Sequence, residues 1–107
     1  MVTVSSNGTQ TAVISTEHTL YNPVTSKFFT AYVDLTNMTS TDTTEIRVYV
    51  IAKTAGSYIQ YYMMSYTGVQ TNPLVYIPPL PSDIGWKLTL KQTAGTGRTY
   101  DWKVYEV

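Results

Sequence analysis

Few side chains of this sequence can do chemistry, and the first to consider is His18, its single histidine. Imidazole changes charge readily near neutral pH, but a catalytic histidine also needs a group to activate and a second group to orient it. Glu17 is the adjacent carboxylate, and in a strand it would point to the opposite face of the sheet. One imidazole and no cysteine also supply no metal-ligand set. We therefore expect no catalytic residue, no metal site and no cofactor, and we interpret His18 as structural.

Two short motifs resemble ligand-binding elements. Gly95-Thr96-Gly97-Arg98 resembles part of a phosphate-binding loop, but such a loop leads into the amino end of a helix, and a strand pattern follows here. We expect a hairpin turn with an exposed arginine instead. Pro78-Pro79-Leu80-Pro81 fits the polyproline pattern that aromatic grooves bind. Because it ends a strand pattern and precedes Ser82-Asp83, we interpret it as a stiff connector.

The composition favours a sheet protein without an electrostatic partner. Nineteen of the 107 residues are threonine and ten are tyrosine, which suit the pleated surface of a sheet. Seven acids balance seven bases, and charged residues make up 13% of the chain, against roughly 25% in ordinary domains. This balance predicts no nucleic acid and no membrane surface as a partner. No apolar run approaches the roughly 18 residues that span a bilayer, and the amino end lacks a signal-peptide pattern, so we expect synthesis in a cytoplasm.

Short runs of β-forming residues recur between turn residues, and no window of useful length has a helical period. Asn7-Gly8 is expected to form a turn, and residues 37–44 a loop. The predicted strands cover Thr11–Ser15, Glu17–Tyr21, Phe28–Thr36, Glu45–Lys53, Tyr58–Tyr66, Leu74–Ile77, Ile84–Gln92 and Arg98–Val107. This pattern predicts an all-β fold: one domain over residues 1–107, built as a single antiparallel β-sandwich of about eight short strands, of which the jelly roll is one form.

The last two predicted strands suggest a hairpin across the five residues from Thr93 to Gly97. Pairing Gln92 with Arg98 would place six apolar or aromatic residues on one face, and a slip by one residue would bring lysines among them. The expected pairs are Leu90 with Tyr100, Leu88 with Trp102, and Trp86 with Val104. This register predicts that the two tryptophans lie side by side in the core.

The run from Tyr58 to Tyr66 does not alternate between apolar and polar residues. By strand geometry, one face carries Tyr58, Gln60, Tyr62, Met64 and Tyr66, and the other Ile59, Tyr61, Met63 and Ser65. Tyrosine and methionine are common where proteins contact proteins. A two-layer sandwich covers one face of a strand, so we expect the other face to be an interface; the alternative is a central strand covered on both sides. The predicted interface residues are Tyr58, Tyr61, Tyr62, Met63 and Tyr66, with Tyr76 and Ile77 as an extension of the patch.

Two segments resemble a known group of proteins. The first contains Gly8-Thr9-Gln10-Thr11-Ala12-Val13-Ile14 and Glu17-His18-Thr19-Leu20, and the second is Leu90-Lys91-Gln92-Thr93-Ala94-Gly95-Thr96-Gly97-Arg98. They resemble small all-β virion structural proteins of tailed bacteriophages, of the head decoration or cement type. The resemblance covers most of the chain in outline, including Glu45-Ile46-Arg47, and consists of strand and turn sequences. It implies a non-enzymatic virion component and carries over no catalytic residue.

The interface pattern and the resemblance together predict a capsid decoration protein, located in the virion and made in the host cytoplasm. Its expected partners are the major capsid protein or another virion protein, and copies of itself in a homo-oligomer. A tail or fibre component is the alternative within this class. A carbohydrate-binding β-sandwich module is the rival from another class, because exposed tyrosines on a sheet can stack on sugar rings. A flat row of exposed aromatic residues beside acids and amides would favour that rival, and the inward tryptophans count against it.

Overall fold

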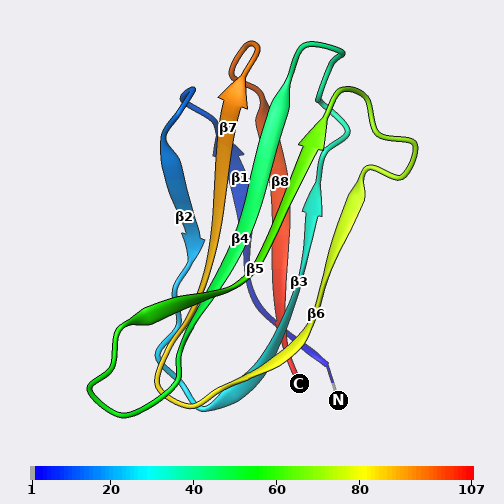
Figure 1. The fold of residues 1–107 in the computed structure, drawn as a ribbon. Helices are drawn as coiled ribbons and strands as arrows, with labels where there is room; N and C mark the ends of the chain where they lie inside the picture. Colours follow the sequence, from blue (N-terminus) through cyan, green and yellow to red (C-terminus); the bar gives the residue numbers. More distant parts are fainter. Residues whose placement is uncertain (1) are drawn as a thin grey trace.

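The computed structural model describes residues 2–107 and consists of two four-stranded antiparallel sheets packed together (Figure 1). The strands are β1 (Thr3–Thr11), β2 (Glu17–Tyr21), β3 (Lys27–Asp34), β4 (Thr43–Ile51), β5 (Tyr58–Thr67), β6 (Leu74–Ser82), β7 (Trp86–Ala94) and β8 (Thr99–Glu106). The described residues form no helix. The predicted all-β antiparallel sandwich is confirmed.

The strand order is that of a jelly roll. Sheet A has the order β1-β8-β3-β6, and sheet B has the order β2-β7-β4-β5. β4 and β5 are consecutive and form a hairpin. Strands farther out in the sequence also pair with one another: β3 with β6, β2 with β7, and β1 with β8. The whole chain is therefore equivalent to one long hairpin. Rolling this long hairpin onto itself adds the pairs β3 with β8 and β4 with β7. The other connections between consecutive strands therefore cross from one sheet to the other.

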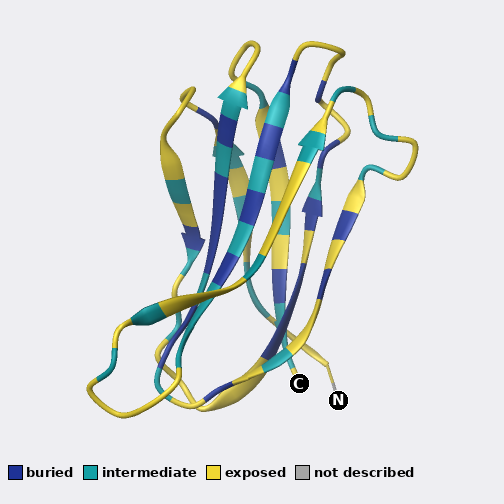
Figure 2. Cartoon of the chain, in the orientation of Figure 1, coloured by how far each residue is buried: buried dark blue, intermediate teal, exposed yellow. Residues whose placement is uncertain are grey.

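The core forms because most strands alternate between inward apolar and outward polar residues. On β4, Ile46 and Val48 are fully buried, whereas Glu45 and Arg47 point outward and pair with each other. Figure 2 shows this alternation as successive bands along β4. The same alternation can be read in the sequence, where Ile46 and Val48 are separated and flanked by charged or polar residues.

A chain of aromatic rings crosses the core. Between ring centroids, Trp86 lies 5.4 Å from Phe29, which lies 6.3 Å from Tyr21. Tyr21 in turn stacks on Trp102 at 6.4 Å. Trp86 is fully buried, whereas Trp102 is half-buried. The prediction that the two tryptophans lie side by side is therefore wrong, because Phe29 and Tyr21 lie between them.

The predicted hairpin between the last two strands is also wrong. β7 lies in sheet B between β2 and β4, and β8 lies in sheet A between β1 and β3. Leu90 pairs with Ile46 and His18 rather than with Tyr100. Leu90 and Tyr100 both face the core, as predicted, but they do so from opposite sheets. The short connection crosses between the sheets instead of turning within one.

Two predicted breaks in the sheet are parts of strands. Asn7 and Gly8 lie within β1, where Gly8 pairs with Trp102. A β-carbon on Gly8 would lie 3.3 Å from the Trp102 ring, so glycine leaves room for the indole. The Pro78 to Pro81 segment, predicted as a connector, continues β6, and Pro81 pairs with Phe28. Proline is tolerated there because β6 is an edge strand, where an N–H can be missing without loss.

Candidate functional site

The predicted interface strand β5 is an edge strand of sheet B, next to β4. The alternative of a central strand covered on both sides is therefore wrong. A β-bulge interrupts its pairing, because Val48 pairs with Tyr62 and Tyr49 pairs with Gln60, which leaves Tyr61 as an extra residue. Bulges bend a strand, and Figure 1 shows β5 bending between its start at the lower left and its end at the top.

The bulge changes which side chains share a face. Tyr58 and Gln60 lie on the outer face of sheet B, whereas the sequence pattern placed them with Tyr62. Ile59 and Met64 point inward, because their partners on β4 pack in the core, yet they are 59% and 48% exposed. Sheet A therefore does not cover them. Figure 2 shows most of the upper part of β5 as exposed.

We call the large, exposed apolar side chains of this strand the β5 edge. Tyr61 is 58% exposed at the bulge, and Met63 is 44% exposed on the outer face. The strand contains no charged residue. The β5 edge consists of Ile59, Tyr61, Met63 and Met64. Sequence reasoning named Tyr61 and Met63 but missed Ile59 and Met64, because the position of an edge strand in the sheet is not visible in its own composition.

The other predicted residues of β5 are half-buried. Tyr62 and Tyr66 pack against the core. Burial, followed by the contact with the Tyr62 hydroxyl, raises the pKa of Tyr66 to about 12. The rings of both tyrosines therefore cover part of the core beneath β5. Tyr58 lies on the outer face, where its hydroxyl donates a hydrogen bond to Asn22.

The two predicted residues of β6 do not lie beside the β5 edge. Ile77 is buried in the core, so the expectation that it extends the patch is wrong. Tyr76 is exposed on the outer face of sheet A, with its ring centroid 5.7 Å from that of Tyr32. Tyr32 in turn lies 5.9 Å from Tyr105. The structure therefore divides the predicted residues between two surfaces.

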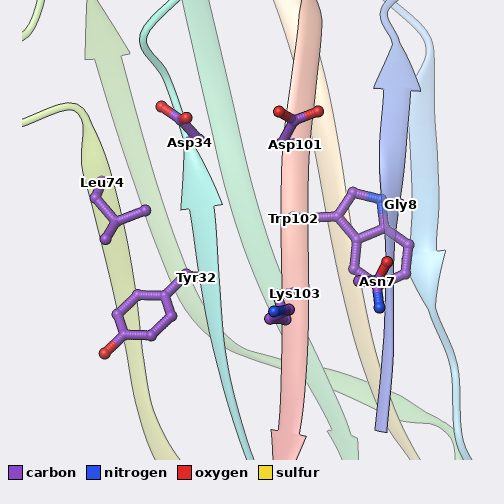
Figure 3. Close-up of a pocket in the computed structure, with 8 residues that line it drawn as sticks. All are labelled: Asn7, Gly8, Tyr32, Asp34, Leu74, Asp101, Trp102 and Lys103. Atoms are coloured by element: carbon purple, nitrogen blue, oxygen red, sulfur yellow. The ribbon is translucent and has the colours of Figure 1, made fainter. Parts of the chain in front are cut away.

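A hollow of about 370 Å³ lies beside these tyrosines on the outer face of sheet A (Figure 3). Asp101 accepts a hydrogen bond from the Thr9 hydroxyl at 2.6 Å, and Asp34 accepts one from the Thr36 amide at 2.9 Å. Figure 3 shows the two carboxylates at the same level on neighbouring strands. We call this region the sheet A hollow, and its side chains include Asn7, Tyr32, Asp34, Leu74, Asp101 and Lys103.

Part of the sheet A hollow could have been found in the sequence. Alternation along β3 places Thr30, Tyr32 and Asp34 on one face. The sequence does not show that β8 and β6 flank β3, and this order is what brings Asp101 and Tyr76 to the same surface. The constellation therefore appears only once the roll of the sheets is known.

A cluster of polar side chains also lies on the outer face of sheet B, and its members bond to one another. Glu17 accepts hydrogen bonds from the Tyr49 hydroxyl at 2.6 Å and the Thr89 hydroxyl at 2.7 Å. Partial burial works to raise the pKa of Glu17, but these two bonds and nearby cations outweigh it and lower that pKa. The Lys87 Nζ lies 4.7 Å from the Tyr49 ring and 4.6 Å from the Tyr58 ring. These contacts join side chains of β2, β4, β5 and β7, and so they stabilise sheet B.

The connections β3–β4 and β7–β8 meet at one end of the sandwich around Asp42, which is fully buried. Asp42 accepts hydrogen bonds from the amides of Thr39 at 2.8 Å and Thr96 at 3.2 Å, and from Nε of Arg98 at 2.8 Å. Burial works to raise the pKa of Asp42, but these bonds outweigh it and hold the pKa below its ordinary value. We call this group the Asp42 end. The predicted exposed arginine is wrong, because Arg98 is half-buried in this ion pair.

His18 has a structural contact. Its Nε2 accepts a hydrogen bond of 3.0 Å from the Val13 amide in the β1–β2 connection. Glu17 lies on the opposite face of β2, as predicted from alternation. Residues 2–107 contain no group of three acids or histidines placed to hold a metal ion. The same residues include no helix with the length and apolar character to cross a membrane.

Comparison with known proteins gives no relative. No family model, curated protein or solved structure matches this chain. The β5 edge exposes large apolar side chains and the sheet A hollow is lined largely by polar ones, so these are the two candidate functional regions.

Proposed function

We propose that this chain is a non-enzymatic structural component of a phage virion, a capsid decoration or cement protein that acts through protein–protein contacts. The phage context comes from the sequence resemblance in residues 8–20 and 90–98. The observation that carries the contact mechanism is the β5 edge, which exposes four large apolar side chains on a strand without charges. Edge strands of this kind associate with other chains unless something covers them. The major capsid protein, another virion protein or a second copy of this chain would provide that cover.

Strengthening of a shell would follow from mass action. A protein that binds the assembled shell and not its free subunits stabilises the assembly, by about 2.7 kcal/mol per site at a concentration 100 times the dissociation constant. The jelly roll is used by viral capsid domains and by lectins. The fold is therefore compatible with this proposal and with the carbohydrate alternative, and the surfaces must distinguish them.

The test is binding to particles that lack this protein. Tyr61→Lys and Met63→Lys place a charge in the β5 edge, and each should weaken co-sedimentation with the particles about 100-fold, or ~2.7 kcal/mol. Val69→Lys is the matched control, because Val69 is exposed in the β5–β6 connection outside the edge. Unchanged binding of both edge variants would contradict the proposal. Binding to isolated tails instead of heads would favour the tail or fibre alternative.

The sheet A hollow supports a second candidate, a carbohydrate-binding module. Tyr32 lines the hollow together with two carboxylates and the Asn7 amide, and the exposed Tyr76 lies next to Tyr32. Aromatic rings, carboxylates and amides are groups that hold sugar rings and hydroxyls. The two rings are tilted by 43°, so they form no flat platform, and both tryptophans face the core side. A glycan array should show hits that Tyr32→Ala removes and Tyr61→Lys retains. An array without hits would reject this candidate.

A further inference from the structure

Three of the four sheet edges carry features that oppose pairing with another chain. β6 contains Pro78, Pro79 and Pro81, which have no N–H to donate. β2 is five residues long and begins with a charged residue. β1 has a bulge between Val4 and Ser6, and from Ser6 to Thr11 it carries only polar residues and one glycine, so it offers no apolar edge. Prolines, short strands and bulges are the means by which natural sheets keep their edges from associating.

The fourth edge, β5, lacks most of this protection. Its ten residues include no proline and no charged residue. Its bulge lies at Tyr61, so the segment Tyr62–Thr67 keeps a regular pairing with β4. Within residues 2–107, no strand pairs with the other side of this segment. Its outward main-chain N–H and C=O groups can therefore receive a further strand.

We propose that β5 pairs with β5 of a second copy of this chain, antiparallel and about a two-fold axis through Met64. The two B sheets, of four strands each, then form one continuous sheet of eight strands. The proposal rests on the proposed function of β5 as a protein contact and deepens it, by naming a copy of the chain as the partner of this edge.

The faces of the side chains limit the register. Residues directly opposite one another across two strands lie on the same face. Met63 and Ser65 point outward and Met64 points inward, as their partners on β4 show. Near the middle of the regular segment, a two-fold axis can pass through Met63, Met64 or Ser65, because each of these choices pairs like faces.

The charges on β4 select among the three axes. Arg47 lies beside Met63 in the sheet, and Glu45 lies beside Ser65. An axis through Met63 places Arg47 of both copies in one row, and an axis through Ser65 does the same with Glu45. An axis through Met64 places Met63 opposite Ser65 of the second copy, so each row joins Arg47 of one copy with Glu45 of the other. This register puts opposite charges at the two ends of each row; the ends lie three strand spacings, about 14 Å, apart, so the preference is a long-range one that salt screens.

The inward faces are also compatible with this axis. Tyr62 lies opposite Tyr66 of the second copy, and Met64 lies opposite Met64. Met64 is exposed in one copy, while Tyr62 and Tyr66 already pack against the core. The pairing therefore extends the apolar interior of each sandwich across the axis and covers Met64.

Cysteine scanning tests the register, because the chain has no cysteine of its own. Opposite Cα atoms in an antiparallel pair lie about 4.5–5.5 Å apart, within the range of about 4.4–6.8 Å that a disulfide needs. Under mild oxidation, Met64→Cys should give disulfide-linked dimers at least about tenfold faster than Met63→Cys or Ser65→Cys. Leu74→Cys, an exposed position on the β6 edge, is the control for random collision.

Light scattering of the unmodified chain is the second measurement, and it depends on no variant. A dimer mass is expected, and Met64→Lys should convert it to a monomer without unfolding it. A monomer at all concentrations up to about 0.5 mM, faster linkage at Met63→Cys or Ser65→Cys, or equal linkage at all positions would each overturn the proposal.

The two proposals fail separately. If the chain is monomeric but binds particles through the β5 edge, another virion protein covers β5, and self-pairing is wrong while the proposed function stands. If Met64→Cys links dimers but the chain binds no particle, self-pairing stands and the virion role is wrong.

Discussion

A globular protein usually buries apolar side chains and exposes charged ones. The Asp42 end departs from this rule by burying a charged side chain, and the β5 edge departs from it by exposing apolar ones. At the Asp42 end, a carboxylate is fully buried and accepts its hydrogen bonds from Thr39, Thr96 and Arg98 of the chain itself. At the β5 edge, large apolar side chains such as Ile59 and Tyr61 remain in water. A buried polar group is stable when its partners are complete, and exposed apolar patches are the surfaces on which we expect contacts with other molecules.

Substitutions in the two regions should therefore change different properties of the protein. Changes at the Asp42 end should alter the free energy of unfolding, because the partners are internal. Changes at the β5 edge should alter association and leave unfolding almost untouched.

Gly95→Ala should be the most destabilising substitution at the Asp42 end. Gly95 has a φ of 88°, and a β-carbon there would overlap Oδ1 of Asp42. Gly68→Ala is the matched control, because Gly68 has a φ of 76° but no neighbour closer than 3.8 Å. Urea unfolding should show a loss of about 4 kcal/mol or more for Gly95→Ala and about 1–2 kcal/mol for Gly68→Ala. Equal losses would mean that backbone strain alone matters at both positions.

Trp86→Ala tests the core that lies between the two regions. Trp86 is fully buried against Phe29, so its truncation should cost about 3–5 kcal/mol. Trp102→Ala should cost less, because Trp102 is half-buried. Trp86→Phe is the conservative partner: the indole Nε1 has no hydrogen-bond partner among the described residues, so this variant loses volume but no bond. Native tryptophan fluorescence that is red-shifted and freely quenched in Trp102→Ala would contradict the burial of Trp86.

The loss of stability caused by Asp42→Asn should depend on pH. The folded pKa of Asp42 is lowered from an ordinary value of 3.8, so the stability that its charge contributes is fully present well above pH 3.8. It is lost as the pH falls through the lower folded pKa. The variant should be about 2–3 kcal/mol less stable than the wild type at pH 7. Urea unfolding between pH 7 and about pH 2.5 should show this gap closing at the acidic end; a gap that is constant with pH would contradict the ionised state.

The sequence was enough to predict which face of a strand a residue occupies, but not which strands pair with each other. Alternation correctly predicted that Leu90 and Tyr100 point into the core, but a period of two residues defines a face and not a sheet. A five-residue connection fits a hairpin and a crossing between sheets equally well, so the β7–β8 pairing was wrong. Asp42 lies in a threonine-rich run that looks like any surface loop. Its burial depends on Arg98, which is distant in sequence and brought close by the roll of the sheets.

Half of the β5 edge was predicted from the sequence, because composition identifies a strand but not its position in the sheet. The density of tyrosine and methionine from Tyr58 to Tyr66 identified the strand. No glycine or proline near Tyr61 indicates the bulge in the sequence. Because of the bulge, Tyr58 lies on the opposite face of sheet B from Tyr62, not on the same face as predicted. The edge position of β5 is a property of sheet B as a whole, so the exposure of Met64 could not be predicted.

His18→Ala should have a small effect. The substitution removes the hydrogen bond from the Val13 amide, which is exposed and can bond to water instead. The expected loss is about 0.5 kcal/mol in urea unfolding, with binding to particles unchanged. Loss of an activity in any assay would contradict the non-enzymatic proposal.

Met64→Lys should have the smallest effect on unfolding, within about 0.5 kcal/mol of the wild type, because Met64 is 48% exposed and a lysine can keep its charge in water. The same variant should abolish association of the chain with itself. The measurement is urea unfolding at a protein concentration where the wild type is monomeric. A loss of more than about 2 kcal/mol under those conditions would place Met64 in the core and erase the contrast with the Asp42 end.

The nested pairing of the jelly roll has a consequence for the order in which the chain folds. β4 and β5 are joined by residues 52–57, so their hairpin closes a short loop, whereas Thr3 of β1 must find Glu106 of β8 at the other end of the chain. Local hairpins form in microseconds and distant pairs form late. We therefore expect the β4–β5 hairpin to form among the first parts of the fold, with the apolar edge of β5 in water before the distant strands have paired. We expect refolding yield to fall steeply as chain concentration rises, and a nascent chain to present β5 before β8 has been synthesised.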